Sequence, residues 1–300
     1  MFLSRKKGKY LKSDNRSNIS YFLEHNVLLR RFTLSVGVLA NYNSALNEGI
    51  HFYPGIDASY RIGDNFRLYG SWNRALRMPT FTDLYYEGKT NKGNPDLKPE
   101  ESEAFEVGLK YNTYFLRAHI AGFYRKGKNM IDWVKEKPED IWESRNLTKV
   151  DNLGFETNLS LLPRELGNER FFIRKIELGY AFIHQDKDSE GYISNYALDY
   201  LKHKFTAQLS HSIWKGFSAT WYVRWQDRAG SYTKYENLKP AYEEPYAPYC
   251  LVDMKVNWEY QRLNLYAELN NLLNSTYYDL GNIPQPGIWF KAGFRYSFKY

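Results

Sequence analysis

Apolar and polar residues alternate with a period of two along most of this chain. Between Phe217 and Arg228, for example, Trp221, Val223 and Trp225 alternate with mostly polar neighbours. Side chains that alternate in this way lie on opposite faces of a β-strand, which excludes a helix. About thirteen segments follow the pattern, counted by alternation and by the turn residues between them. They include 32–40, 66–72, 105–111, 116–124, 205–209, 217–228, 252–258, 263–269 and 290–300.

The connections between these segments are of two kinds, and the two kinds alternate. The short turns are 30–31, 63–65, 112–113, 214–216 and 260–262, with a looser one at 163–170. The long polar connections are 45–50, 77–101, 127–146, 187–200, 229–247 and 275–287. An antiparallel meander with short turns at one end and long loops at the other is typical of outer-membrane β-barrels.

The two faces of the segments differ in a way that suits a membrane. Several segments keep their alternation for about ten residues, the length that a tilted strand needs to cross hydrocarbon. The apolar faces carry no charge at mid-strand, whereas the opposite faces carry Arg224, Glu268 and Arg295. A cation at the bilayer midplane costs about 2–4 kcal/mol, so this segregation favours an all-β, antiparallel transmembrane barrel. The alternative is a soluble carbohydrate-binding β-protein, in which the apolar faces would meet each other.

Composition narrows the classes further. No apolar run is long enough for a transmembrane helix. The 27 Tyr, 18 Phe and 8 Trp argue against a disordered chain. The single cysteine, Cys250, cannot form an intramolecular disulfide. The 41 basic and 34 acidic residues are interleaved, so the net charge of +7 does not predict a nucleic-acid partner.

The sequence carries no sign of catalysis. It lacks a G-x-S-x-G elbow, a phosphate-binding loop, an H-E-x-x-H pair and an EF-hand loop, and its six histidines are dispersed. We therefore expect no enzyme activity, no catalytic residue, no metal site and no cofactor. A barrel lipase or protease is the weaker alternative.

The strand count predicts an incomplete barrel. Edge strands cannot lie in lipid with unpaired backbone groups, and bacterial single-chain barrels have an even number of strands. About thirteen strands do not meet this condition. We expect residues 1–16 to be a partial outer loop or a disordered start, and residues 17–300 to be the C-terminal portion of a larger barrel.

The longest loop contains the most specific motif of the chain. Its ordered residues are Arg77, Pro79, Gly93, Asn94, Pro95, Leu97, Pro99 and Glu100, followed by Glu106 in the next strand. The two X-Pro steps fix extended corners, and Glu100 and Glu106 are expected to hold polar partners inside the wall. A Pro-rich surface loop explains the prolines but not the ordered spacing. The motif resembles the mid-barrel signature of TonB-dependent outer-membrane receptors.

Two further stretches are similar to that family. Gly154 and Glu156 stand at the beginning of a later strand, and Pro286 and Gly287 precede a final strand that ends on Tyr300. Three residues depart from the family pattern, which weakens a substrate assignment more than the fold. They are Leu273, Asn274 and Ile288, which stand where an aromatic, an Asp and a basic residue are common.

The resemblance implies a place in the cell outer membrane and a part in the uptake of a scarce, bulky nutrient. In the family, a plug domain fills a barrel of about 22 strands, and the inner-membrane TonB complex drives passage through that plug. The plug and the N-terminal strands have no counterpart in these residues. The implied partners are outer-membrane lipid, the plug, the TonB complex and a small-molecule nutrient.

Among family branches, the loop spacing is most similar to that of cobalamin transporters. A siderophore or haem receptor is the alternative within the family, and a passive porin the alternative outside it. Tyr and Trp offer large contact areas with a polar tip, so loop aromatics are the candidate ligand contacts, although packing within the loops also explains each of them. The candidates are Tyr85, Tyr86, Trp142, Tyr192, Tyr196, Tyr232, Tyr235, Tyr242, Tyr277 and Tyr278.

Overall fold

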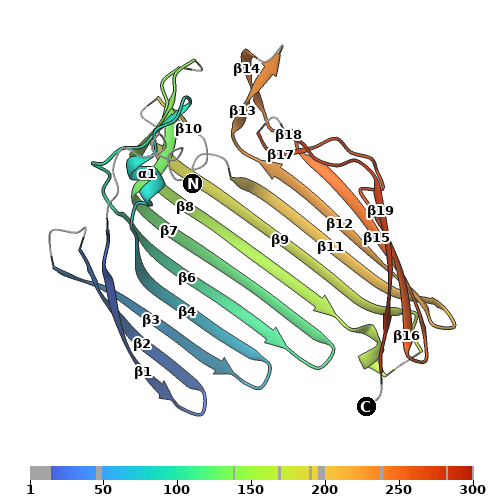
Figure 1. Cartoon of the computed structure of the whole chain (residues 1–300). Coiled ribbons are helices and arrows are strands. Elements are labelled where there is room, and N and C mark those ends of the chain that lie inside the picture. Colours follow the sequence, from blue (N-terminus) through green and yellow to red (C-terminus); the bar gives the residue numbers. More distant parts are fainter. Residues whose placement is uncertain are drawn as a thin grey trace. The chain divides into compact units, whose positions relative to one another are not determined.

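The computed structural model describes residues 15–44, 49–137, 139–167, 170–188, 191–194, 200–236, 239–281 and 283–298. Within this part, thirteen strands follow one another in hydrogen-bonded order, β1-β2-β3-β4-β6-β7-β8-β9-β11-β12-β15-β16-β19. This confirms the predicted meander and its strand count. Figure 1 shows the strands in chain order.

The bounds of these strands are β1 (Asn18–Leu28), β2 (Phe32–Asn43), β3 (Ile50–Ile62), β4 (Phe66–Arg77), β6 (Glu100–Asn112), β7 (Leu116–Lys135), β8 (Trp142–Leu161), β9 (Ile173–Asp188), β11 (Leu201–Trp214), β12 (Phe217–Arg228), β15 (Tyr249–Tyr260), β16 (Leu263–Asn270) and β19 (Trp289–Tyr296). The connections hold the shorter elements α1 (Phe81–Tyr85), β5 (Asn91–Lys92), η1 (Pro163–Leu166), β10 (Ile193–Ser194), β13 (Ser231–Glu236), β14 (Lys239–Pro245), β17 (Tyr278–Leu280) and β18 (Ile283–Pro284).

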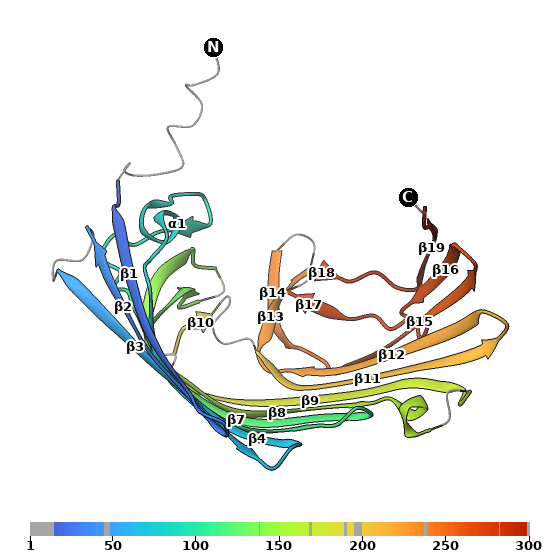
Figure 2. The ribbon, with the colours of Figure 1, turned by 90° about the horizontal axis from the view of Figure 1, so that it is seen from below.

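The chain divides into two compact units. The first comprises Met1–Gly108, Gly122–Gly154 and His184–Asp199, and the second comprises Leu109–Ala121, Phe155–Ile183 and Tyr200–Tyr300. In the first unit, α1 and β10 lie at the strand ends opposite the turns β1–β2 and β3–β4 (Figure 1). In the second, the hairpins β13–β14 and β17–β18 lie side by side in both ribbon views (Figures 1 and 2).

Strand register separates the two faces of the first unit. Leu23 lies opposite Val38, and Val38 opposite Pro54, which continues one apolar row across β1, β2 and β3. One residue further along, Glu24 and Gly37 form a pair on the other face. Because facing residues of antiparallel strands share a side of the sheet, the alternation of each strand adds up to one apolar and one polar face.

The second unit shows the same segregation. Leu265 lies opposite Phe294 on the apolar face of β16 and β19. On the polar face, the Glu268 carboxylate lies 2.8 Å from the Lys255 ammonium and 2.5 Å from the Lys291 ammonium. This face is a ladder of charges, which belongs in water rather than in a dry core.

The apolar faces are exposed and not packed against each other within either unit. Phe52, Ile56 and Val107 of the first unit and Leu265 and Phe294 of the second are all exposed large apolar side chains. A soluble sandwich would bury them, so the single-layered wall of a membrane barrel is confirmed. The buried apolar core lies instead near the loops, where Val134 and Leu147 pack with Met130 and Tyr192.

The long connections are more regular than their polar sequences predicted. The expected loop 127–146 is largely strand, because β7 extends to Lys135 and β8 begins at Trp142. Alternation fades there because neither face of this outer extension needs to meet lipid. The expected loop 229–247 is the hairpin β13–β14. Within the described residues, no helix has the length and apolar character needed to cross a membrane.

Candidate functional site

The motif loop folds into a short helix with a defined start. The Thr80 side chain accepts a hydrogen bond from the Asp83 N–H over 3.1 Å, and the Asp83 carboxylate accepts one from the Thr80 N–H over 3.0 Å. Each side chain satisfies a backbone donor that a helix start leaves free. Pro79 is buried directly before this pair, and its carbonyl accepts a bond from Arg16 Nη2 over 2.9 Å. The Thr80-x-x-Asp83 spacing is a sequence signal that would have located α1.

Glu100 joins three strand ends. Its carboxylate accepts two hydrogen bonds from the Arg77 guanidinium, one of them over 2.6 Å. It also accepts the Ile131 N–H over 2.7 Å. Glu100 is only 7% exposed, and a buried carboxylate needs such charge-assisted partners. It thereby holds β4, β6 and β7 together at the base of the motif loop.

Asn146 holds the second half of the loop through the backbone. Its Oδ1 accepts the Lys98 N–H over 2.8 Å, and its Nδ2 donates to the Lys98 carbonyl over 2.9 Å. The same Nδ2 donates to the Asn129 carbonyl over 2.6 Å. The Asn146 side chain therefore bonds to the loop backbone in the way that a neighbouring strand would.

The backbone at Gly93 passes too close to α1 for any side chain. A Cβ there would lie 2.9 Å from the Asp83 carbonyl oxygen. That oxygen accepts the Asn94 N–H over 2.8 Å and the Ser144 hydroxyl over 2.7 Å. Glycine is required because the loop and α1 share these polar groups at backbone distance.

The remaining motif residues line the wall and the loop. Leu97 is buried, whereas Pro95 is exposed and Pro99 half-buried. Glu106 accepts a hydrogen bond from the Tyr69 hydroxyl over 2.8 Å.

The two motif residues predicted at the beginning of a later strand lie instead past the middle of β8, because that strand already begins at Trp142. Gly154 is buried in the first unit. In the second unit, the Glu156 carboxylate lies 3.9 Å from His119 Nδ1.

Two candidate aromatics of the first unit pack against cations that the sequence did not single out. The Lys135 ammonium lies 4.5 Å from the centre of the Trp142 ring, and the Arg145 guanidinium lies 4.9 Å from that of Tyr192. Arg145 also donates hydrogen bonds to the Tyr192 hydroxyl and to Glu143, and the bond to Glu143 raises the pKa of Arg145. Each of these two rings therefore has a positive charge beside it.

Tyr85 and Tyr86 follow one another at the end of α1 but contact different rings. Tyr85 stacks on Phe81 with 6.3 Å between ring centres. Tyr86 meets the edge of Trp133 at 6.5 Å. In the first unit, these four candidate aromatics each contact a different side chain of α1, β7 or β8.

The ending of the chain is organised by two asparagines in the left-handed region. Asn271 has φ 52° and Asn274 has φ 48°, a conformation that asparagine tolerates better than most residues. Asn271 Nδ2 donates to the Pro286 carbonyl over 3.2 Å. A Cβ on Gly287 would lie 2.5 Å from Asn274 Oδ1, so Asn274 and Gly287 fit together.

Two candidate aromatics of the second unit, Tyr232 and Tyr278, form a tyrosine cluster with Tyr246. The Tyr232 ring lies 5.1 Å from Tyr246 and 5.4 Å from Tyr278. Tyr249 and Tyr277 pack beside each other at 4.6 Å. The cluster joins the hairpin β13–β14 to the segment that contains β17, which explains why these hairpins lie side by side in Figure 2.

Exposure divides the candidate aromatics of the hairpin β13–β14. Tyr232 is 7% exposed, and burial raises the pKa of its hydroxyl. Tyr235 and Tyr242 of the same hairpin are 51% and 52% exposed, so their rings are open to a ligand. Tyr196 and Tyr300 lie outside the described residues.

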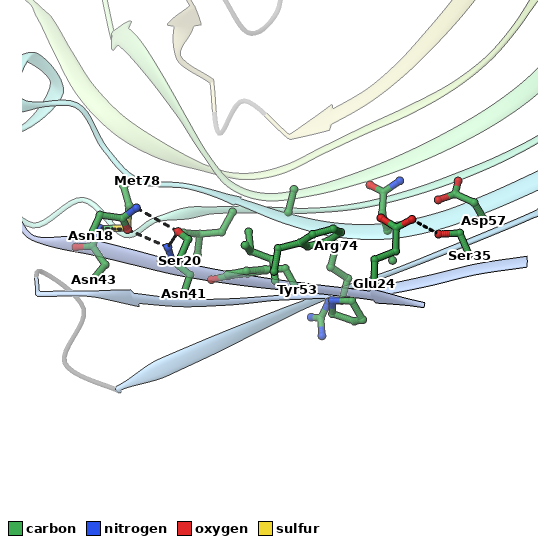
Figure 3. Close-up of a pocket in the computed structure, with 18 of the residues that line it drawn as sticks. Asn18, Ser20, Glu24, Ser35, Asn41, Asn43, Tyr53, Asp57, Arg74 and Met78 are labelled. Carbon is green, nitrogen blue, oxygen red and sulfur yellow. Dashed lines mark hydrogen bonds between the residues drawn. The ribbon is translucent and has the colours of Figure 1, made fainter. Parts of the chain in front are cut away.

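The polar face of β1 to β4 contains a hollow that the sequence did not predict. It has a volume of about 690 Å³. At one end, Asn41 Nδ2 donates to Asn18 over 2.9 Å and to Ser20 over 2.8 Å (Figure 3). At the other end, the Ser35 hydroxyl donates to Glu24 over 3.0 Å (Figure 3). These residues come from β1 and β2, which are neighbouring strands joined by a short turn.

A family model described as TonB dependent receptor-like, beta-barrel matches residues 5–272. Two relatives described as vitamin B12 transporter BtuB come from Vibrio vulnificus and Photobacterium profundum. They are 26% and 23% identical over 56% and 70% of this chain. The matches cover 36% and 34% of those relatives, so the chain spans about a third of their length. The ferrienterobactin receptor of Escherichia coli is 22% identical over 89% of this chain and 38% of that protein.

Solved structures show the same fold. The ferric enterobactin receptor PfeA of Pseudomonas aeruginosa superposes with a TM-score of 0.74 at 19% identity, over 94% of this chain and 45% of the receptor. The FrpB iron transporter of Neisseria meningitidis superposes with a TM-score of 0.70 at 17% identity, again over 94% and 45%. The paired strands, the packed motif and the family match lead to one conclusion: this chain belongs to the TonB-dependent receptor-like β-barrel family of the outer membrane.

Proposed function

We propose that this chain forms barrel wall and ligand-contacting loops of an outer-membrane receptor for the TonB-energised uptake of a scarce, bulky nutrient. The observation that carries the proposal is the motif cluster, in which Glu100, Asn146 and Gly93 hold a long loop rigidly at the rim. A passive porin has no need of such a loop framework. A plug domain and the TonB complex are the partners that this function requires.

We infer that the nutrient is cobalamin or another corrinoid. Two of the relatives described above carry the name of a vitamin B12 transporter. A corrin is a broad, largely apolar macrocycle with amide groups at its edge. Rings with a polar tip suit such a surface, and Tyr235 and Tyr242 present two of them on one exposed hairpin.

A ferric siderophore is the second candidate. The ferrienterobactin receptor aligns along 89% of this chain, more than either vitamin B12 transporter does. A catecholate siderophore is anionic when loaded, so it would favour loop cations such as Arg145 beside Tyr192. Corrinoid binding is therefore expected to depend on Tyr235 and Tyr242, and siderophore binding on Arg145.

Binding measurements on the protein purified from outer membranes test the proposal. Cyanocobalamin and ferric enterobactin are titrated against the wild type and the double variant Tyr235→Ala/Tyr242→Ala. Loss of two aromatic contacts is expected to weaken corrinoid binding about tenfold or more. Tyr114→Ala, at an exposed position in the short turn between β6 and β7, is the matched control and should bind as the wild type does.

A third variant separates the two ligands. Arg145→Gln should weaken ferric enterobactin binding if a siderophore is the nutrient, and should leave corrinoid binding within about twofold. Retention of wild-type affinity for both ligands in all variants would remove these loops from the binding role. Absence of binding to either ligand would refute the substrate assignment while leaving the family assignment in place.

A further inference from the structure

The helix α1 is too short to be stable by itself. It comprises little more than one turn, Phe81–Tyr85, and isolated helices shorter than about twelve residues are marginal in water. Hydrogen bonds from the Leu84 N–H to the Thr80 carbonyl and from the Tyr86 N–H to the Thr82 carbonyl close this turn. Contacts from outside the helix must therefore hold it in place.

One of these contacts comes from Arg16, which stands 63 positions before Pro79 in the sequence. The Arg16 guanidinium donates from Nη2 to the Pro79 carbonyl, 2.9 Å away, directly before the residue that caps α1. Its central carbon lies 4.9 Å from the centre of the Phe81 ring, within the range of a cation–π interaction. The Nε atom is shielded from solvent, so the side chain is packed and not free in the loop. Arg16 thus contacts both the start of α1 and its first ring.

The backbone next to Arg16 is held at the rim of the sheet. The Ser17 N–H donates to the Ser44 hydroxyl over 2.9 Å, and the Ser17 carbonyl accepts the Ser44 N–H over 3.0 Å. In the sheet, β2 and β3 lie between β1 and β4, which would separate β1 from β4 by about 14 Å if the sheet were flat. Arg16 and Met78 both line the hollow on the polar face of these strands. The Arg16 side chain therefore spans the loop end of that hollow and reaches α1 from the side of β1.

The Phe81 ring passes this contact on to a candidate ligand ring. Phe81 and Tyr85 stand four residues apart in α1 and therefore lie on one face of the helix. Their rings stack with 6.3 Å between centres and 21° between planes. Tyr85 is half-buried, so part of its ring is open to a ligand. The guanidinium and the two rings form one row, in the order Arg16, Phe81 and Tyr85.

We propose, on the basis of the function proposed above, that Arg16 is a positioning residue for nutrient binding. It orients α1 through the Pro79 carbonyl and the Phe81 ring, and it thereby holds the Tyr85 ring where that ring contacts the nutrient. Arg16 itself does not touch the nutrient. Lysine cannot fully replace it, because an ammonium group is a point charge and lacks the flat fork that donates a hydrogen bond and stacks at the same time.

A double-mutant cycle on the protein purified from outer membranes tests the proposal. Cyanocobalamin and ferric enterobactin are titrated against the wild type, Arg16→Gln, Tyr85→Ala and the double variant. The ligand that binds the wild type should bind Arg16→Gln about fivefold more weakly. In the Tyr85→Ala background, Arg16→Gln should change the affinity by less than about twofold, because the ring that Arg16 positions is gone. Equal weakening in both backgrounds would show that Arg16 acts on the loops in general, and would overturn the proposal.

A second measurement does not depend on the nutrient. Hydrogen exchange at the Leu84 and Tyr86 amides, which close the turn of α1, should become about tenfold faster in Arg16→Gln. In Arg16→Lys it should become only about threefold faster, because the positive charge beside the Phe81 ring is kept. Unchanged exchange in Arg16→Gln would overturn the proposal. If neither ligand binds the wild type, the substrate assignment fails, and exchange still decides whether Arg16 holds α1.

Arg30→Gln is the matched control. Arg30 is exposed in the short turn between β1 and β2, at the end of β1 that lies away from α1. The substitution removes the same charge from the same unit without touching the helix. Nutrient affinity and exchange in α1 should both stay within about twofold of the wild type. A fivefold loss of affinity in this control would assign the effect to net charge and would also overturn the proposal.

Discussion

The motif cluster of the first unit and the tyrosine cluster of the second organise their loops by different forces. In the motif cluster, side chains such as Glu100, Asn146 and Ser144 bond to backbone groups of distant segments. In the tyrosine cluster, Tyr232 of β13 and Tyr278 of β17 join two hairpins by contact between their rings.

The two clusters therefore differ in how strongly they restrict the conformation of their loops. Directional hydrogen bonds to the backbone specify one conformation and tolerate little change. Ring contacts depend less on angle, so a hairpin held by them can shift and repack. The first arrangement suits a framework, and the second suits a surface that adapts to a ligand.

Glu100→Ala should have the largest effect on this comparison. It removes both acceptors of the Arg77 guanidinium and the partner of the Ile131 N–H, and should cost about 3 kcal/mol of unfolding free energy. Urea unfolding in lipid vesicles measures this change. Glu87→Ala, at an exposed position of the same loop, is the control and should change the unfolding free energy by less than about 0.5 kcal/mol.

Asn146→Ala should have the next largest effect, about 2 kcal/mol, because three backbone groups lose a partner. Hydrogen exchange at Lys98 reports the loss directly. Asn94→Ala removes a single bond, to the Asp96 N–H, and should cost about 1 kcal/mol or less. If the two substitutions lower the unfolding free energy by the same amount, the hydrogen bonds of Asn146 are not what holds the loop.

Tyr246→Phe should cost about 1 kcal/mol in the second unit, because the Gly281 N–H loses its acceptor. The ring contacts remain, so the opening should stay local to the segment around Gly281. Hydrogen exchange there is the measurement, with Tyr232→Phe as the control that retains every ring. A global loss of stability in Tyr246→Phe would mean that the tyrosine cluster depends on hydrogen bonds as the motif cluster does.

The smallest predicted effect is a loss of hairpin stability at alkaline pH. Burial raises the pKa of Tyr232 above its ordinary value of 10.0. The folded hairpin, which lies outside the membrane-spanning segments, therefore keeps its proton where the unfolded chain begins to lose it. The stabilisation is complete below pH 10.0 and falls as the pH rises through the raised pKa.

Absorbance at 295 nm, compared between the wild type and Tyr232→Phe, follows this titration. Exchange at the hairpin should increase in the same range in the wild type. A late-titrating tyrosine that persists in Tyr232→Phe would assign the effect to another residue.

Period-two alternation predicts the strands of the wall but not the hairpin β13–β14. The segment from Phe217 to Arg228 was predicted as a strand and is β12 with those bounds. Alternation worked because one face meets lipid and the other water, so every strand carries the same two-sided pattern. Beyond the membrane this contrast is lost, so the sequences of the outer extensions of β7 and β8 predict a loop although they form strands.

The candidate site was predictable only in part. The motif residues stood out because Pro, Gly and Asn have local conformational roles, as at Gly93 and Asn94. Asn146 and Lys98 bond to each other although they stand 48 positions apart in the sequence. No local sequence pattern predicts a contact over that separation. Which tyrosines are exposed also depends on how the hairpins pack, so sequence alone could not separate Tyr232 from Tyr235.

The rings of Trp72, Phe105 and Tyr124 form a row across β4, β6 and β7, with 6.5 Å between neighbouring ring centres. Two residues further toward the long loops, each of these strands carries a charged residue. Two residues of a strand rise about 7 Å, so the protein fixes its own depth in the bilayer to within a few ångströms. A thicker or thinner membrane would have to stretch or compress around Trp72, Phe105 and Tyr124, at a cost that grows with each ångström of mismatch. Hydrocarbon thickness is thus a variable to which this wall should be sensitive.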